Sequence, residues 1–476
     1  MYIDLGRSFY RMKKIAILFL LLFILLGCTP KNKAIYDSQN NVYVMDVYLD
    51  TQLDTLTVEG ELYYKNDFYD LEELYINIYP NAINPRGSGY NIVFEYFKIN
   101  GQNAVYDITG TDHTVMHVPL LQTLTAGERI SITYKYSFEY WSIDRIVTYH
   151  NYYLTLFFYP YVAIYDQDGW NIEPYTFRGE VYYNTIGDYY VTINVPEEYL
   201  VASSGALIKE KVTDLRKTLE YSIKDARDFS FSASSDYRFY ERTIDDIEYQ
   251  IYAIRDLSTN EIEDSFSYLS RSMEIMERSI GEYFYDHFTL EYGYFYGMES
   301  TGVIYCSNEI QEATVVHEMI HQWFYSMIGN DQANESFLDE ALTTYTTSLY
   351  FYDLYGINGY NEYLNYRSSL KPELSERYEA NIGVSLLREV DEYGDYYGYL
   401  IYYHGPSMFR YYVNEFLDGN IDQMINIFTT YYQTYNKSIA TLNEFLDLME
   451  QVSGIENTKE WFYLQLNEFQ DFDNRP

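Results

Sequence analysis

The run His317-Glu318-Met319-Ile320-His321 places two histidines four residues apart, with a glutamate directly after the first of them. No proline or glycine interrupts residues 311–328, so a helix is expected here. Because residues i and i+4 share one face of a helix, both imidazoles can reach the same metal ion. The glutamate lies beside the first histidine, where it can touch a metal-bound water without binding the metal itself. The run therefore predicts a metal centre on a helix.

A second segment supplies a third ligand. Catalytic zinc usually takes three protein ligands and leaves its fourth position to water. Residues 335–345 also favour a helix and offer Glu340, nineteen positions after His321. Asp339 is a carboxylate as well, so it is the spacing that favours Glu340. We expect one Zn²⁺ per chain, held by His317, His321 and Glu340.

Taken together, these residues resemble the signature of the M1 aminopeptidases, a gluzincin family of zinc peptidases. The resemblance rests on the run from His317 to Trp323 followed at this spacing by Glu340. Residues 297–302, Gly-Met-Glu-Ser-Thr-Gly, resemble the family's Gly-Ala-Met-Glu-Asn exopeptidase motif. Residues 402–405, Tyr-Tyr-His-Gly, resemble its Tyr-x-Lys-Gly segment, and residues 228–234 resemble a stretch that closes its N-terminal domain. The resemblance runs from about residue 40 to at least 415.

The resemblance implies hydrolysis of the N-terminal residue from peptides through a zinc-bound water. It implies that Glu318 is the general base and that Tyr402 is catalytic, as a donor to the oxyanion that forms. It also implies that Glu299, with Gly297 and Met298, binds the substrate. The Glu299 carboxylate would pair with a free α-ammonium, so the expected partners are peptides with a free N-terminus.

Several positions depart from the family pattern and leave alternatives open. Ser300 replaces the asparagine of the exopeptidase motif, so a zinc endopeptidase or a tripeptide-type peptidase is the alternative among enzymes. His404 replaces the lysine after the tyrosine, and Ala341 replaces the glycine after the third ligand. A catalytically inactive peptide-binding lipoprotein is the alternative outside the enzymes. The intact ligands and Glu318 argue against it, because a binding module needs no general base.

The patterning predicts an α+β multidomain fold. From about Val42 to Tyr237 the sequence alternates with period two and is rich in β-branched and aromatic residues, which is typical of strands. After about Asp246 the apolar residues recur at helical spacing. We therefore expect an antiparallel β sandwich or saddle domain at 34–240. A thermolysin-like, mostly helical zinc peptidase domain is expected at 241–476, without the large helical C-terminal domain of bigger family members.

The first 33 residues read as a targeting segment. Lys13 and Lys14 precede an apolar run at 15–26, too short to span a bilayer. The run ends in Leu25-Leu26-Gly27-Cys28, which resembles the lipobox of bacterial lipoproteins. We expect a signal peptide with a lipobox and linker at 1–33, lipidation at Cys28 and an extracytoplasmic protein anchored to the cell membrane. An uncleaved anchor and a plain signal peptide are the alternatives, and either Met1 or Met12 could be the start.

Amino-acid composition excludes several classes of function and partner. The chain has 32 Lys and Arg against 71 Asp and Glu, a net charge of −39 at pH 7. Such a surface repels phosphate backbones and anionic headgroups, so no nucleic acid and no basic membrane-docking patch are expected. Apart from Cys28 the sequence contains one cysteine, Cys306, so no internal disulfide is expected in the mature protein. Side-chain preference, physiological substrate and oligomeric state stay open.

Overall fold

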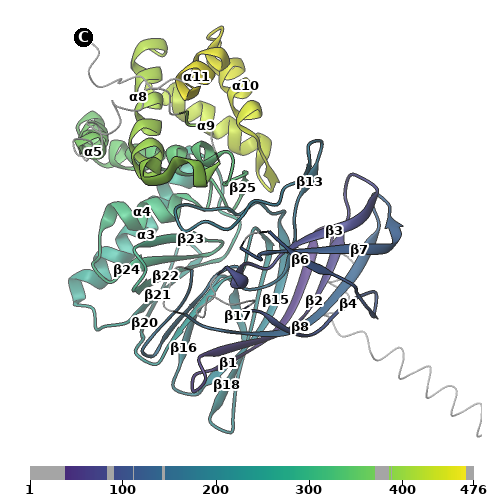
Figure 1. Ribbon diagram of the computed structural model, residues 1–476. Coiled ribbons are helices and arrows are strands. Elements are labelled where there is room, and N and C mark those ends of the chain that lie inside the picture. Colours follow the sequence, from purple (N-terminus) through teal and green to yellow (C-terminus); the bar gives the residue numbers. More distant parts are fainter. Residues whose placement is uncertain are drawn as a thin grey trace, which may run out of the picture.

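The computed structural model describes residues 38–82, 91–110, 112–141, 145–369, 385–387 and 389–467. Figure 1 shows the N-terminal strands, purple to teal, gathered on one side of the molecule. Four helices lie at the opposite end: α8 (Gly405–Phe416), α9 (Ile421–Tyr435), α10 (Leu442–Ser453) and α11 (Thr458–Asn467). The metal-binding motif lies between these two groups.

The largest sheet of the described residues has eight strands. Strand β1 pairs antiparallel with β2 and parallel with β15, so the chain returns to its first strand after passing through smaller sheets. Alternate residues along β1, β2 and β8 are buried, as the period-two pattern predicts. In order across the sheet the strands are β17 (Ala206–Thr213), β18 (Arg216–Ala226), β15 (Gly187–Pro196), β1 (Asn41–Asp50), β2 (Thr55–Lys65), β8 (Arg129–Glu139), β4 (Val93–Ile99) and β5 (Gln102–Asn103).

Smaller sheets share one apolar core with the large sheet. The first contains β10 (Ile146–Tyr149), β11 (Tyr152–Thr155), β19 (Phe231–Ser234) and β16 (Leu200–Ser203). The second contains β12 (Tyr161–Val162), β3 (Leu71–Asn77), β7 (Val115–Leu124) and β6 (Asp107–Thr109), with the short helix η1 (Tyr79–Asn81) after β3. Strands β13 (Tyr165–Asp166) and β14 (Gly169–Trp170) form a separate hairpin.

Tyrosine fills much of this core. Of the 61 tyrosines in the chain, several are fully buried here, among them Tyr134, Tyr136, Tyr159 and Tyr189. Their rings pack edge-to-face or stacked, as between Tyr159 and Tyr189 at 5.6 Å. The many tyrosines therefore fill positions in the core as well as on the surface.

A mixed five-stranded sheet begins the second part of the chain. Its order is β20 (Arg238–Ile244), β21 (Ile247–Ala253), β22 (His287–Gly293), β24 (Val303–Ser307) and β23 (Gly297–Ser300). Helix α3 (Thr259–Ser279) starts with a capping box between Ser258 and Glu261. Helix α4 (Glu312–Ile320) packs against α3 and against β23 and β24.

The remaining elements are mostly helical. The π-helix η2 (Phe337–Ala341) runs into α5 (Leu342–Ser369), which breaks at Gly356 where φ is +63°. The segments η3 (Val390–Tyr396), α7 (Tyr397–Tyr399) and the π-helix η4 (Leu400–His404) lead into α8. Strand β25 (Ile328–Gly329) pairs parallel with β26 (Ser438–Ile439).

The predicted fold class is confirmed: sheets come first and a mostly helical region follows. The predicted boundary at residue 240 lies within β20, the first strand of the five-stranded sheet, and the division of the chain at this point stays a prediction. The predicted signal segment 1–33 and Cys28 lie outside the described residues. None of the helices in the described part could span a bilayer, since each is too short or too polar.

Glu291 gives the fold a pH dependence that can be measured. The side chain is fully buried on β22, and Tyr237 Oη donates a hydrogen bond of 2.8 Å to it. Burial raises the pKa of Glu291 from 4.5 to about 8. A carboxyl whose pKa is higher in the folded state stabilises the fold below its unfolded pKa, and this contribution is lost as the pH rises through the folded value.

We expect Glu291→Gln, which cannot ionise, to remove this dependence. Relative to the variant, the free energy of unfolding of the wild-type protein should fall by about 1–3 kcal/mol between pH 5 and pH 8. Urea denaturation of both proteins at the two pH values measures it. A difference that does not change with pH would contradict the assignment.

Candidate active site

The helix that the histidine run predicts is shorter than expected. Helix α4 holds His317 in its last turn, and His321 caps its C-terminal end with helical φ and ψ of −60° and −13°. The chain then turns back, with Ser326 N donating to the His321 carbonyl at 3.0 Å. Both imidazoles stay on one side of the helix, because the helical geometry continues through the cap.

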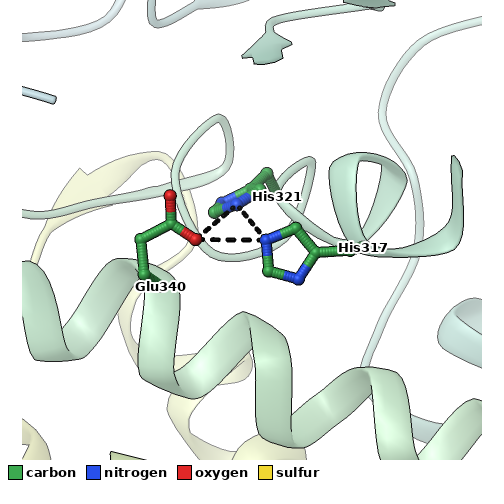
Figure 2. A group of neighbouring side chains, drawn as sticks. All are labelled: His317, His321 and Glu340. Atoms are coloured by element: carbon green, nitrogen blue, oxygen red, sulfur yellow. Dashed lines mark hydrogen bonds and ion pairs between the residues drawn. The ribbon is translucent and has the colours of Figure 1, made fainter. Parts of the chain in front are cut away.

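Three ligand atoms converge on one point, as Figure 2 shows. His317 Nε2 lies 3.1 Å from Glu340 Oε2 and 3.3 Å from His321 Nε2. His321 Nε2 lies 3.4 Å from the same oxygen of Glu340. The three side chains are at most 5 % exposed. Glu340 comes from η2, so the structure brings the predicted third ligand from a second helical segment onto the same point.

This triangle of atoms fits zinc. Zinc binds nitrogen and oxygen at about 2.0–2.2 Å with tetrahedral angles, which separates neighbouring ligand atoms by about 3.3 Å. The three separations of 3.1, 3.3 and 3.4 Å lie around this value. The donor set of two imidazoles and one carboxylate is also one that catalytic zinc uses.

A second carboxylate contacts His321 at Nδ1, the ring nitrogen that does not belong to the triangle of ligand atoms. Asp339 Oδ1 lies 3.1 Å from His321 Nδ1, and the Phe324 carbonyl and Thr343 Oγ1 lie 3.2 and 3.3 Å from the same nitrogen. A carboxylate on the far nitrogen keeps the near nitrogen free for a metal and raises its basicity. The sequence analysis gave Asp339 no role, although its place beside Glu340 was the available signal.

Burial and neighbouring charges alter the protonation of these groups. Burial lowers the pKa of His317 to about 4, although Glu340 opposes it. Burial raises the pKa of Glu318 to about 8, and Glu340 adds to the rise. Burial would also raise the pKa of Glu340, but His321 and His317 outweigh it and hold that pKa below its usual range. Glu340 is therefore an ionised ligand.

Strand β23 places the predicted ammonium-binding glutamate beside the metal ligands. Glu299 is 2 % exposed, and its carboxylate lies within 4.8 Å of ligand atoms of His321 and Asp339. Gln332 Nε2 donates to Glu299 at 3.1 Å and to Asp339 at 2.8 Å. Burial raises the pKa of Glu299 well above its usual range, and nearby carboxylates raise it further.

Gly297 and Met298 lie on the same strand but contact different parts of the protein. A Cβ at Gly297 would lie 2.4 Å from Glu318 Oε1, so a glycine here leaves room for that carboxylate. The Met298 side chain instead packs into the core of the β domain.

Ser300 turns away from the site and joins a network that holds β23. Its hydroxyl donates to Asp228, which also accepts from Thr301 N at 2.8 Å. Gln322 Nε2 donates to the Ser300 carbonyl at 3.0 Å, and Gly302 N donates to Gln322 at 2.9 Å. The serine at this motif position therefore ties the strand to the β domain and to the end of α4.

The phenol of Tyr402 reaches the metal ligands from η4. Tyr402 Oη donates to Glu340 Oε1 at 2.5 Å, and its ring centre lies 6.0 Å from that of His317. Burial raises the pKa of Tyr402 well above its usual range, and Glu340 adds to the rise. Tyr402 therefore keeps its proton and can donate a hydrogen bond.

One carboxylate of the site comes from the β domain and was missed. Oxygens of Glu180, Asp339 and Glu340 lie within 4.8 Å of one another. The Arg145 guanidinium donates to Glu180 at 2.9 Å, and both side chains are buried. Glu180 lies far from the histidine run in sequence, and no local pattern marked it.

Two imidazoles and a carboxylate around one point, with Glu318 beside them, define a metal-dependent hydrolase. Residues 285–471 match the model of the Peptidase family M1 domain. Residues 285–471 therefore carry an M1 peptidase domain, which makes the protein a metallopeptidase, as the sequence predicted. No curated protein sequence matches the chain.

Solved structures share the fold along most of the chain. A two-domain M1 zinc metallopeptidase mutant bound to L-arginine has 13 % identity and a TM-score of 0.66, covering 92 % of this chain and 96 % of its own. The M1 zinc metallopeptidase of Deinococcus radiodurans has 13 % identity and a TM-score of 0.65, covering 91 % and 94 %. A mutant of the Deinococcus radiodurans enzyme bound to the substrate Tyr-Ser-Ala has 14 % identity and a TM-score of 0.66, covering 92 % and 96 %.

The geometry assigns metal binding and proton transfer to different residues: His321 is a ligand, whereas Glu318 is the base. Metal analysis of variants can test this assignment. We expect the purified protein to hold about one zinc ion per chain. His321→Ala should lose the ion together with activity, because it removes a ligand. Glu318→Gln should keep the ion and lose turnover by several orders of magnitude. Elemental analysis and peptidase assays of the same preparations measure both, and equal zinc loss in the two variants would contradict the separation.

Proposed function

We propose that the protein is a zinc aminopeptidase, which removes the N-terminal residue from peptides. The observation that carries this proposal is the Glu299 carboxylate, buried beside the metal ligands. Among the described residues, no lysine or arginine forms an ion pair with it. A free α-ammonium would supply the missing positive charge and fix the first peptide bond at the metal site.

The chain's own groups fit the steps of hydrolysis. Zinc held by His317, His321 and Glu340 would supply Lewis acidity and a nucleophile at neutral pH. Glu318 directly follows His317 in the chain and is not part of the triangle of ligand atoms. It can accept a proton from the attacking water and return it to the leaving amine. Gly297 leaves the space in which this carboxylate sits.

Tyr402 lies where its phenol can stabilise the negative charge that develops on the oxyanion. Its phenol lies at the ligand Glu340 and keeps its proton, so it can turn its hydrogen bond toward an oxyanion. One such donor contributes about 3–4 kcal/mol to transition-state stabilisation in comparable sites.

The endopeptidase alternative rested on Ser300, and the direction of its side chain, away from the metal ligands, supports the aminopeptidase instead. The Ser300 hydroxyl is bonded to Asp228 in the domain interface, so it does not line the site that the substrate would enter. The D. radiodurans neighbour that binds Tyr-Ser-Ala is consistent with short peptides as substrates. Peptides with a free N-terminus are thus the substrates proposed here.

We also propose that lipidation at Cys28 anchors the protein at the outer face of the cell membrane. Support comes from the short apolar run after Lys13 and Lys14 and from the lipobox-like residues 25–28. An extracytoplasmic peptidase would there act on peptides outside the cell.

The role of Glu299 predicts how the enzyme treats blocked peptides. Wild-type enzyme should reject N-acetylated peptides, because acetylation removes the cation and leaves Glu299 unpaired. Glu299→Gln should lose roughly ten- to a hundredfold in kcat/KM on free peptides, as expected for a charge-assisted hydrogen bond. The variant should also lose most of its discrimination against acetylated peptides. Paired assays with free and acetylated forms of one peptide measure both effects.

Ser300→Ala is the matched control on the same strand, since its side chain faces the other way. It should keep the preference for a free N-terminus. Comparable wild-type rates on free and acetylated peptides would instead favour the endopeptidase.

The anchor proposal predicts a change of partitioning. The full-length protein should enter the detergent phase after expression with its leader, and Cys28→Ala should appear in the aqueous phase. The reason is that removing the thiol removes the acceptor of the lipid. Phase separation followed by immunoblotting measures this, and a Cys28→Ala protein that stays in the detergent phase would point to an uncleaved segment.

A further inference from the structure

Three large apolar side chains lie exposed at one end of the β domain. Leu121 on β7 is 86 % exposed, Val105 between β5 and β6 is 79 % exposed, and Phe68 between β2 and β3 is 77 % exposed. Leu121 and Val105 both line a groove of about 590 Å³ beside the hairpin of β4 and β5. Apolar side chains that gather on an exposed face mark a surface that contacts a partner or a membrane.

Hydrogen bonds place the three side chains at the same end of the large sheet. Asn66 Nδ2 donates to the Leu124 carbonyl at 2.9 Å, so the turn that carries Phe68 lies beside the end of β7. Strands β2 and β8 meet here, where Lys65 pairs with Arg129. Arg129 also lines the groove, so the groove and the turn after β2 belong to one end of the domain.

The described chain begins at this same end. The Arg129 guanidinium donates to the Ser38 carbonyl at 2.7 Å and to the Asn40 carbonyl at 3.0 Å. Cys28, where we propose the lipid, precedes Ser38 by ten residues, and ten residues span at most about 36 Å when fully extended. A lipid at Cys28 would therefore hold this end of the β domain close to the bilayer.

The active site lies away from this end. Figure 1 shows β4 and β7 on the side of the β domain that is remote from α4, the helix that carries His317. Contact with a bilayer at this end would leave the active site open to peptides in solution. The net charge of −39 repels anionic headgroups, so apolar side chains and not cations would make the contact.

We propose that Leu121, Val105 and Phe68 form a membrane-contact surface, which enters the headgroup region of the bilayer and orients the anchored enzyme. The inference rests on the proposed lipid anchor at Cys28. The lipid holds the protein at the membrane, and a second, apolar contact fixes which face the protein turns toward it. The bilayer is favoured over a protein partner because the short tether brings this end of the domain to the bilayer itself.

A fluorescent label on the membrane-contact surface tests the proposal. The lipid occupies the Cys28 thiol and Cys306 is buried, so Leu121→Cys supplies the thiol that reacts with an environment-sensitive fluorophore. The labelled, lipidated protein is reconstituted into phosphatidylcholine vesicles, whose headgroups carry no net charge. Its emission should shift to the blue, and nitroxide-labelled lipid should quench it severalfold more strongly than it quenches a label at the opposite end of the sheet.

Leu53→Cys is the matched control, because Leu53 is also apolar and 69 % exposed but lies in the turn between β1 and β2. Strand β2 runs from Thr55 to Lys65, so this turn is about 33 Å from the end of the sheet at Arg129. The label at Leu53→Cys should be quenched little, and vesicles should leave its emission unchanged.

Equal quenching of the two labels, in vesicles that carry the protein, overturns the membrane-contact surface. A blue shift of the Leu121→Cys label in soluble Cys28→Ala protein, growing with protein concentration, would place a second copy on this face and also overturns it. Flotation of the vesicles measures the anchor separately. Protein that does not float with them overturns the lipid anchor and the membrane-contact surface together.

Discussion

The buried negative charge around two imidazoles is the constraint on which this structure depends. Each carboxylate of the cluster is at most 7 % exposed: Glu180, Glu299, Glu318, Asp339 and Glu340. Among the described residues, Arg145 is the one arginine or lysine that forms an ion pair within the cluster. Burying an ionised carboxylate without a partner costs several kcal/mol, which is why the pKa values of Glu299 and Glu318 are raised, and a cation at this place would favour their ionised forms. A metal ion fits between the two imidazoles and Glu340, and a substrate ammonium is the second cation in the proposed function.

The same constraint explains why the two parts of the chain must fit closely. Asp228 of the β domain holds Ser300 and Thr301, while Gln322 holds the same turn from the end of α4. Gln322 follows His321 directly, so the ligand helix and the strand carrying Glu299 are fixed to one another. At Gly302, φ is +74° and a Cβ would lie 2.5 Å from the Ser204 carbonyl of the β domain. The position of Glu299 relative to the predicted metal ligands is thus set by the domain interface.

The sequence predicted the parts of the site that depend on local spacing. His317, His321 and Glu340 follow helical periodicity and a short connection, and the structure brings them together. Glu299 was found by its resemblance to a family motif, although the four-residue edge strand that carries it has no clear alternation. A carboxylate that a distant segment contributes to the site leaves no pattern in the sequence around the histidines. The sequence therefore could not indicate Glu180.

The detailed packing of the site was also beyond the sequence. Residues 311–328 carry no helix-breaking residue, yet α4 ends at Ile320 because the chain turns back at His321. Helical propensity does not report where tertiary packing ends a helix. The tyrosines show the same limit, since composition alone could not tell that Tyr134 and Tyr136 are fully buried.

Two π-helical turns explain how this chain tolerates Ala341 where the family has glycine. Glu340 lies in η2 and Tyr402 in η4, and the two segments pack against each other. A π turn takes up an extra residue and changes the direction of the side chains around it, and such turns are frequent at functional sites. A Cβ at Gly405 would lie 2.4 Å from the Cβ of Ala341, so the close approach depends on a glycine in the opposite segment. That approach allows the Tyr402 phenol to reach Glu340, and Gly405 leaves the space that the Ala341 methyl group needs.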